Sequence, residues 1–347
     1  MILHWNKAYD KYPFLNEDIE QCPNDLWKKC HVITDTQKAS DADVITFYGT
    51  HMGMLGMKRY FNRFIKMRQN SDAIFLFHSR EPPTITGSFG NWSYDFFDMT
   101  MTYRRDADIF NALFEIVPKN GTLQKSDIGG KWLKPNFNEE LRTLKLSFKN
   151  KKKMATWLVS KCTTPGRREQ YVRKIQEYLD LEIFGKCGLR KLPKSDSDDE
   201  KQLDVYRKLL RPYYFYFSFE NTRCQDYISE KFYNVLATKS AIPVVFGPSK
   251  IDYEKVAPPH SFIHISDFKN ASMLTDYLFY LSENSTAYME YFWWTSYYSV
   301  RRTERICSVC EKLYEIRSEK RPTKRIKNFN SYWVRDADCN NPETAPW

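Results

Sequence analysis

The 347-residue sequence has no apolar run of about 18 residues, the length at which a helix can cross a membrane. Its first ten residues lack the basic segment and the apolar stretch of a secretory signal peptide. With 12 Gly and 16 Pro it is not a collagen-like or low-complexity chain, and with 42% hydrophobic residues it is too apolar for disorder. We therefore expect about two globular domains, either cytosolic or separated from a membrane anchor that lies outside this sequence.

Several ligand-binding motifs are also missing. There is no G-x-G-x-x-G dinucleotide fingerprint and no Walker A phosphate loop. The six histidines form no ligand cluster, and Cys307-x-x-Cys310 has no second C-x-x-C, which argues against zinc. Two D-x-D triplets occur, Asp41–Asp43 and Asp106–Asp108, and we interpret both as structural rather than metal-binding.

The cysteines and the glycosylation sequons indicate the cellular compartment, and the net charge indicates possible binding partners. Eight cysteines are present, and four N-x-[ST] sequons occur, at Asn91, Asn120, Asn270 and Asn284. Together these features favour a secretory lumen over the cytosol. The net charge of +10 suits nucleic acid, a membrane surface or a phosphate-bearing small molecule, or serves solubility alone.

Short apolar runs alternate with helical patterns in two successive blocks. A basic polar run at 150–153 separates the blocks and predicts a domain boundary there. Strands separated by helices of about 10–15 residues are typical of βαβ units with parallel sheets, so the sequence predicts two Rossmann-like α/β domains. The expected strands are 1–5, 44–48, 73–77, 97–103, 155–160, 181–185, 213–219 and 242–246, and the expected helices are 54–69, 168–179, 227–239 and 271–282.

Residues 213–239 predict a ligand site. Glu220 and Asn221 follow the expected strand 213–219, at the edge where α/β folds bind ligands. Asp226 is the expected N-cap of the next helix. The apolar positions Ile228, Phe232, Val235 and Leu236 recur with helical spacing and predict its buried face.

A polar stripe is expected on the same helix, formed by Tyr227, Glu230, Lys231 and Asn234. A helix N-terminus and a lysine attract phosphate, and a glutamate can accept hydrogen bonds from ribose hydroxyls. The alternative interpretation is an ordinary charge pair on a solvated helix face.

These residues belong to a long ordered motif. F-E-N-x(4)-D-Y-I-S-E-K-F at 219–232 continues into A-I-P-V-V-F-G-P at 241–248 and Y-E-x(3)-P-P-H-S-F-I-H-I-S-D-F at 253–268. The whole closely resembles the signature of the α1,3-fucosyltransferases, glycosyltransferase family 10. The likeness includes T-Y-R-R-D-A-D-I at 102–109, Ser160, Arg168–Tyr171 and the late C-x-x-C. It covers residues 1 to about 312 and leaves out the tail 314–347.

The resemblance implies a GT-B fold with an interdomain cleft. Residues 1–150 would bind the acceptor, 151–300 would bind GDP-fucose, and 301–347 would return toward the first domain. The implied reaction transfers fucose from GDP-β-L-fucose, with inversion, to the 3-hydroxyl of GlcNAc in a glycoprotein or glycolipid glycan, either N-acetyllactosamine or an N-glycan core. No metal is required, although manganese can stimulate. The implied location is the Golgi lumen, with a type II membrane anchor outside this chain.

The resemblance also assigns residues. Glu81 would be the catalytic base, although here it precedes Pro-Pro where the family has Ser-Pro. Arg168 and Lys231 would hold the diphosphate and Glu230 the ribose. Further positions correspond to the donor pocket or the cleft: Tyr216, Asn221, Tyr227, Ser160 (followed by Lys161 where the family has Asn) and, on the first domain, Tyr103.

The remaining expectations concern the disulfide bonds and the alternative functions. By resemblance, Cys307 and Cys310 bridge to Cys22 and Cys30, and another bridge is expected among Cys162, Cys187 and Cys224. A catalytically inactive relative that binds nucleotide-sugar or glycan is the alternative function. A nucleic-acid partner is not expected, because the basic residues are dispersed and no binding motif occurs.

Overall fold

The computed structural model describes residues 1–6, 22, 29–51, 61–89, 93–119, 132–135, 137, 148–191, 199–303, 306–318, 325–341 and 346–347. They form two compact units, one of residues 1–112 and 303–339 and the other of residues 113–302 and 340–347. These boundaries differ from those predicted near 150 and 300. The reason is that β7 (Phe114–Pro118) pairs antiparallel with β13 (Tyr298–Arg302), so both strands belong to the second unit.

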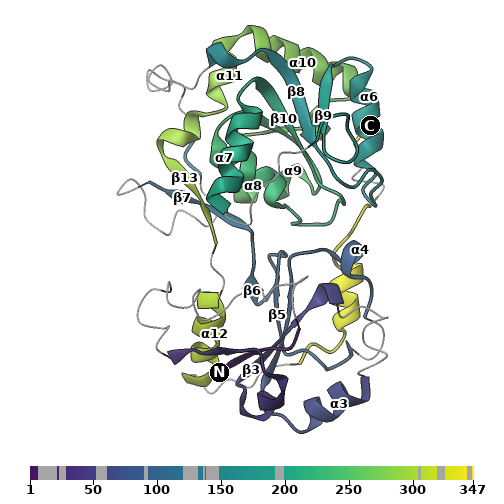
Figure 1. The fold of residues 1–347 in the computed structure, drawn as a ribbon, viewed down its shortest axis with the longest axis vertical. Helices are drawn as coiled ribbons and strands as arrows, with labels where there is room; N and C mark the ends of the chain where they lie inside the picture. The colour runs from purple at the N-terminus through teal and green to yellow at the C-terminus, as the bar shows by residue number, and fades with distance from the viewer. Residues whose placement is uncertain are drawn as a thin grey trace. The chain divides into compact units, whose positions relative to one another are not determined.

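The first unit contains a six-stranded parallel sheet of order β2-β1-β3-β4-β5-β6 (Figure 1). The predicted strands at 1–5, 44–48, 73–77 and 97–103 are confirmed within two residues. The predicted helix at 54–69 is α3 in its later part, and its beginning lies outside the described residues. The bounds are β1 Ile2–His4, β2 Val32–Ile33, β3 Val44–Tyr48, β4 Ile74–Ser79, β5 Met99–Thr102, β6 Ile109–Phe110, η2 Thr36–Asp41, η3 Gly49–His51, α3 Phe61–Gln69, α4 Pro83–Thr86, α12 Ile306–Ser318 and η9 Ser331–Arg335.

The core of this unit includes side chains from the end of the chain. The ring of Phe329 lies 4.5 Å from that of Phe97, and Trp333 lies 4.8 Å from Phe77. The indole N–H of Trp333, which has no exposed surface, donates to the hydroxyl of Thr86 at 2.8 Å. The tail is therefore an integral part of the first unit.

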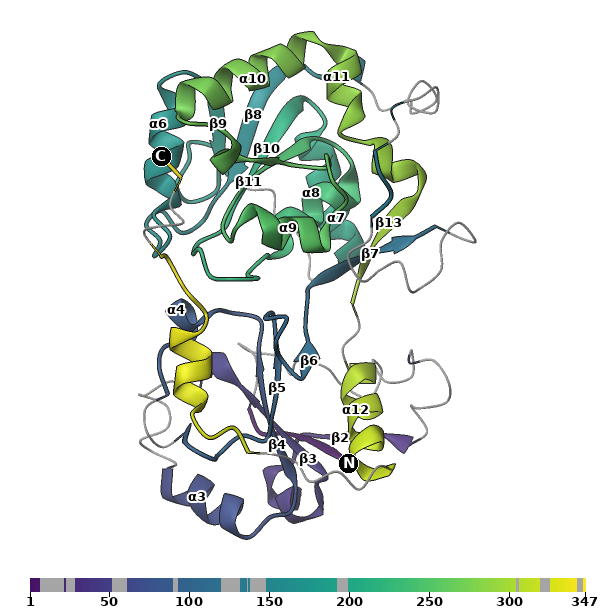
Figure 2. The ribbon, with the colours of Figure 1, turned by 180° about the vertical axis from the view of Figure 1, so that it is seen from behind.

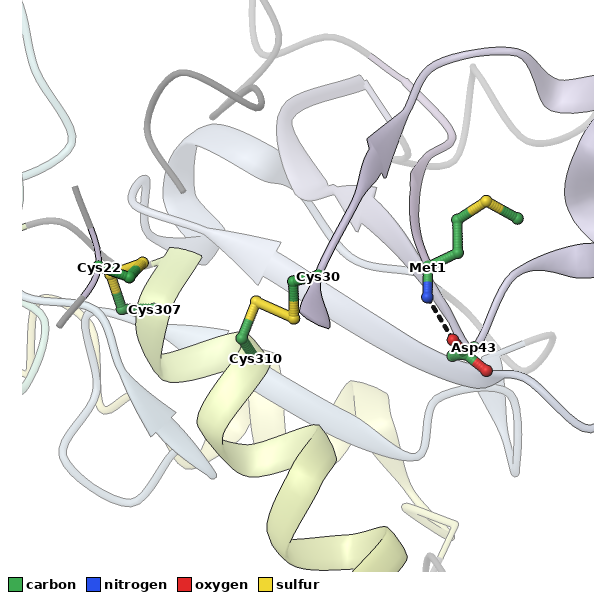
Figure 3. Close-up of a disulfide and its surroundings, with 6 residues drawn as sticks. All are labelled: Met1, Cys22, Cys30, Asp43, Cys307 and Cys310. Carbon is green, nitrogen blue, oxygen red and sulfur yellow. Dashed lines mark hydrogen bonds and ion pairs between the residues drawn. A yellow bond between two sulfur atoms is a disulfide. The ribbon is translucent and has the colours of Figure 1, made fainter. Parts of the chain in front are cut away.

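Two disulfides also join distant parts of the first unit. Cys22 bonds Cys307 and Cys30 bonds Cys310, which confirms the predicted bridging of these four residues (Figure 3). Figure 3 shows Cys307 and Cys310 on α12, each meeting a cysteine of the early chain. In the second unit Cys162 bonds Cys187, which resolves the pair that the sequence left open. Every cysteine is disulfide-bonded.

The second unit is built on a five-stranded parallel sheet of order β12-β11-β10-β8-β9 (Figures 1 and 2). Both faces are covered. Phe215, Phe217 and Phe219 share a core with α6 and α10, whereas Tyr216 shares one with α7 and α8. Burial on both faces explains the continuous apolar run 213–219, because neither side of the strand meets water. The bounds are η6 Phe148–Asn150, β8 Lys153–Leu158, α6 Arg168–Gln176, β9 Leu181–Phe184, α7 Asp199–Leu210, β10 Tyr213–Phe219, α8 Glu230–Thr238, β11 Ile242–Phe246, α9 Lys250–Val256, β12 Ile263–His264, η7 Ile265–Asp267, α10 Ala271–Glu283, α11 Ser285–Glu290 and η8 Trp293–Ser296.

The basic run at 150–153 is not a linker. Lys153 begins β8, and the ammonium of Lys151 donates to the carbonyl of Tyr213 at 2.7 Å and to that of Ser240. The run therefore ties the start of β8 to the neighbouring strands. Among the helices of the described residues, none has the length and apolar character needed to span a membrane.

Candidate functional site

The candidate site lies at the carboxyl ends of β8 and β10, where helices α6 and α8 begin. α6 begins at Arg168 and α8 begins at Glu230. The predicted N-cap, Asp226, is wrong: it has a left-handed backbone with φ of 63°, and Ser229 caps α8 by accepting from the backbone N–H of Lys231. Tyr227 therefore precedes the helix. The predicted apolar face of α8 is confirmed by the burial of Ile228, Phe232, Val235 and Leu236.

A buried carboxylate lies at the centre of the site. Glu220, which follows β10, has 0% exposed surface. The backbone N–H of Ser229 donates to its Oε1 at 2.8 Å, and the hydroxyl of Ser229 lies 2.8 Å from both carboxylate oxygens. Burial raises the pKa of Glu220, and the nearby ammonium of Lys231 partly offsets this. Glu220 thus anchors the start of α8.

Lys231 joins this carboxylate to a second, exposed one. Its Nζ lies 3.3 Å from Oε2 of Glu220, 2.8 Å from the Ser229 hydroxyl and 3.1 Å from Oε1 of Glu230. The side chain of Lys231 is 18% exposed and that of Glu230 is 53% exposed. Burial lowers the pKa of Lys231, but the two carboxylates outweigh burial and hold it above its usual value. The predicted polar stripe is incorrect at Asn234, which is buried.

The second cation of the site is Arg168, which is only 3% exposed. Its guanidinium donates to the carbonyls of Phe219 at 2.5 Å and Lys161 at 3.4 Å, and it lies over the ring of Trp157. Among the described residues its Nε has no hydrogen-bond partner. Burial lowers the pKa of Arg168, and the charge of Glu220 opposes this shift. The guanidinium is therefore fixed by backbone carbonyls, with donor capacity left over.

The remaining donor-pocket residues lie at different distances from this centre. Tyr216 and Tyr227 are buried within electrostatic range of Arg168. Asn221 is buried next to Glu220, and its carbonyl accepts from the N–H of Gly166 at 2.9 Å. Ser160 is exposed in the loop after β8. The structure thus places most of the predicted donor residues at one end of the sheet, with Ser160 at its surface, whereas Tyr216 lies midway along β10.

Glu81 and Tyr103 belong to the first unit. Glu81 follows β4, where its backbone N–H donates to the hydroxyl of Ser79 at 3.2 Å and its carbonyl accepts from that hydroxyl at 2.7 Å. Glu81 also raises the pKa of Tyr48, after the larger effect of burial. Tyr103 is buried with its ring 5.9 Å from Trp333. Both residues lie just past strand ends of the first sheet.

The sequence analysis placed Glu220 at the ligand-binding edge of the sheet but assigned no role in the site to Glu220 or to Ser229. Glu220 is the one charged residue adjoining the apolar run 213–219, and a charge next to a buried strand needs a partner. Ser229 precedes Glu-Lys at the true start of the helix, which is an ordinary N-cap signal. Asp226 obscured this signal because it is an equally good cap by residue type.

No group of three or more potential metal ligands occurs among the residues that the structure describes. The two D-x-D triplets bond protein groups instead. Asp43 pairs with the amino group of Met1 and with Arg317, as Figure 3 shows for Met1. Asp108 accepts from the backbone N–H of Thr100 at 2.8 Å.

Two α/β units, each built on a parallel sheet, with cations and helix N-termini at the carboxyl edge of one sheet, have the architecture of the GT-B glycosyltransferases. The family model "Glycosyltransferase family 10 (fucosyltransferase) C-term" matches residues 148–331, and "Fucosyltransferase, N-terminal" matches residues 1–113. The chain therefore belongs to glycosyltransferase family 10, the fucosyltransferases. The predicted family and the predicted GT-B class are confirmed.

Curated relatives resemble the chain over most of its length. Alpha-(1,3)-fucosyltransferase fut-1 of Caenorhabditis elegans is 30% identical over 344 residues, which are 96% of this chain and 69% of that protein. Alpha-(1,3)-fucosyltransferase C of Drosophila melanogaster is 30% identical over 296 residues, which are 84% of this chain and 65% of that protein. The chain thus spans about two thirds of the length of these relatives.

A solved structure supports the fold. A crystal structure of an alpha1,3-fucosyltransferase aligns with 94% of this chain and 92% of its own, with a TM-score of 0.53 and 16% sequence identity. At that identity the likeness concerns the fold alone.

Proposed function

We propose that the chain is the catalytic part of an inverting α1,3-fucosyltransferase. It would transfer fucose from GDP-β-L-fucose to the 3-hydroxyl of a GlcNAc residue in a glycoprotein or glycolipid glycan. The observation that carries the proposal is the group of Arg168, Glu220 and Lys231 at the starts of α6 and α8, in a chain of this family. Such a group suits the diphosphate of a nucleotide-sugar.

The donor half of the reaction depends on positive charge. A nucleoside diphosphate leaves as a stable anion, so it needs cations and N–H donors rather than a strong general acid. In the proposal Arg168, Lys231 and the first N–H groups of α6 and α8 supply them. Glu230 is exposed and can turn from Lys231 to the ribose hydroxyls, whereas the buried Glu220 keeps Lys231 in place. Asn221, Tyr216, Tyr227 and Ser160 complete the donor pocket.

The acceptor half depends on one carboxylate. The GlcNAc 3-oxygen attacks C1 of fucose, the bond from C1 to the GDP oxygen breaks, and GDP leaves with that electron pair. Glu81 takes the hydroxyl proton, and attack opposite the leaving group inverts C1. Tyr103, the cleft tyrosine of the first unit, is proposed to lie on the acceptor side as well. In this scheme no metal is required, although manganese can stimulate.

The proposed setting is the Golgi lumen, with a type II anchor outside this chain. The disulfides suit that oxidising compartment. The acceptor is N-acetyllactosamine or an N-glycan core, and both belong in the assay.

The test replaces the proposed base. Glu81→Gln should lower fucose transfer by about 100- to 10,000-fold, the range that a general base contributes, while GDP affinity stays near that of the parent protein. Glu177→Gln, which changes an exposed carboxylate on the second unit, is the control. Transfer is measured with GDP-fucose and both acceptors, and GDP binding by calorimetry. Undiminished transfer would remove Glu81 as the base, and a parent protein that binds GDP without transfer to either acceptor would favour an inactive relative.

A further inference from the structure

A pocket of about 410 Å³ occurs in the second unit, away from the candidate site. Five basic side chains line it: Lys151, Arg207, Lys208, Arg211 and Lys239. Lys151 precedes β8, Arg211 follows α7, and Lys239 follows α8. These positions place the pocket at the amino edge of the sheet, whereas the candidate site is at the carboxyl edge. β10 has seven residues, so the two edges are about 20 Å apart.

No carboxylate lines the pocket within the described part of the chain. Arg207 does pair with Asp204 on α7, but both side chains are about half exposed, and such pairs exchange readily with other anions. Burial lowers the pKa of Lys239, and the charge of Lys119 lowers it further. Cations gathered in this way repel one another, and a bound anion would relieve that repulsion.

The C-termini of helices explain only part of this gathering of basic side chains. Arg211 and Lys239 follow the C-termini of α7 and α8, where carbonyl groups favour a cation. Lys151 belongs to no helix, and its ammonium is held by the carbonyls of Tyr213 and Ser240. Burial lowers its pKa to about 7. An anion in the pocket would favour its protonated form, so binding and protonation of Lys151 would support each other.

The rest of the lining is apolar and aromatic. Phe148, Tyr288, Met289 and Phe292 contribute to it. The ring of Phe148 meets that of Tyr288 edge-on at 5.3 Å, and Tyr288 is fixed by its hydroxyl, which donates to the carbonyl of Tyr214 at 2.8 Å. A rigid aromatic floor beside several cations suits a ligand with an apolar or ring-shaped part and a charged group.

We propose that this pocket is a second anion site, which binds a phosphate ester through Lys151, Arg207, Lys208, Arg211 and Lys239 and holds its organic part on the aromatic floor. The site is independent of the proposed transfer reaction, because it shares no residue with the donor pocket. The phosphate ester is either a soluble organic phosphate or a phospholipid headgroup, and the two sources can be distinguished by experiment.

The binding test uses the intact chain without GDP, because GDP is itself a phosphate ester with a ring-shaped part and would compete for this pocket. Phenyl phosphate and inorganic phosphate are titrated by calorimetry against the parent protein and the triple variant Arg207→Gln/Lys208→Gln/Arg211→Gln. All three side chains are exposed, so the variant should fold, and its Tm verifies this. We expect phenyl phosphate to bind more tightly than inorganic phosphate, and the triple variant to bind it at least about tenfold more weakly.

A matched control removes the same charge elsewhere in the unit. Arg173→Gln/Lys186→Gln/Lys269→Gln changes three exposed side chains outside the pocket and should leave binding unchanged. Equal loss in both triple variants would mean that net charge alone attracts phosphate, and the proposal would be overturned.

The source of the ligand is tested with vesicles. Phosphatidylcholine vesicles with and without phosphatidylinositol 4-phosphate are sedimented with each variant. Pocket-dependent binding to the phosphoinositide vesicles supports a headgroup, and pocket-dependent binding of phenyl phosphate alone supports a soluble ester. If neither probe binds in a way that depends on the pocket cations, there is no such site.

Discussion

Nζ of Lys231 lies 3.3 Å from Oε2 of Glu220, a side chain with no exposed surface. The same ammonium lies 3.1 Å from the exposed carboxylate of Glu230. One cation thus has a buried partner and an exposed partner. The two partners have the same charge but different surroundings, so their replacement should have different consequences.

The first prediction compares these carboxylates. Glu220→Gln should destabilise the protein by about 1–3 kcal/mol, because a buried charge-assisted contact with Lys231 is lost and the amide NH₂ faces donors. Glu230→Gln should cost under about 1 kcal/mol, because its pair with Lys231 is exposed. Denaturant unfolding measures both values. Equal costs would show that burial does not distinguish the two carboxylates.

The second prediction separates the structural role of Lys231 from its proposed phosphate role. Lys231→Met leaves the buried charge of Glu220 without its lysine partner, and should destabilise by about 3–5 kcal/mol. Glu220→Gln/Lys231→Met removes both charges and should recover part of that loss. GDP affinity should stay at least about tenfold reduced in both variants, as calorimetry would show, because the diphosphate loses a cation. Recovery of GDP affinity in the double variant would argue against the phosphate role.

The third prediction concerns the pH dependence of stability. Lys151 has a pKa of about 7 in the folded protein, against an ordinary value of 10.5. Between these pH values the unfolded chain binds the extra proton, so the contribution of Lys151 to stability rises with pH. The stability of the parent protein relative to Lys151→Met should therefore increase from pH 7 to pH 10 by up to about 1.4 kcal/mol per unit. Unfolding at several pH values gives this slope.

The control for that slope is the exposed neighbour Lys152. Lys152→Met removes a lysine from the same run without disturbing the carbonyl contacts of Lys151. A pH-independent difference between the parent protein and Lys151→Met would show that this ammonium is freely solvated.

The fourth prediction concerns the disulfide next to the candidate site. Cys162 and Cys187 are 25 positions apart, and their bridge closes the chain around α6. Cys162→Ser/Cys187→Ser should cost roughly 3.5 kcal/mol by the loop-closure relation. The carbonyl of Lys161 bonds Arg168, so GDP affinity should fall as well. A loss of stability with unchanged GDP affinity would show that Arg168 is held without the bridge.

The sequence predicted β8, β9, β10 and β11 within two residues, but it did not predict β7, β12 or β13 of the same unit. A run such as 213–219 is apolar throughout, and it can be satisfied only between two helical layers. The start of α8 was predicted less well. Asp226 and Ser229 are both suitable caps, and only the tertiary contact of Ser229 with Glu220 selects the later one.

The domain boundary depended on contacts between residues that are far apart in sequence. The lysines at 151–153 resemble a linker in composition, yet Lys151 is bonded to the carbonyls of Tyr213 and Ser240. Likewise, β7 belongs to the second unit because of its pairing with β13, which begins 180 residues after Pro118. No local pattern at 114–118 could reveal that partner.

The two bridges from α12 to Cys22 and Cys30 have a consequence for biosynthesis. The ribosome makes the chain in order, so the first sheet emerges long before α12, Phe329 and Trp333 are available. Until then the early cysteines are unpaired thiols, and part of the aromatic core has no cover. Residues 113–302, the larger part of the second unit, can fold in the meantime. The unit that is synthesised first can thus complete its disulfides and its aromatic core only after residues 303–339 have been made, so its folding extends over almost the whole of synthesis.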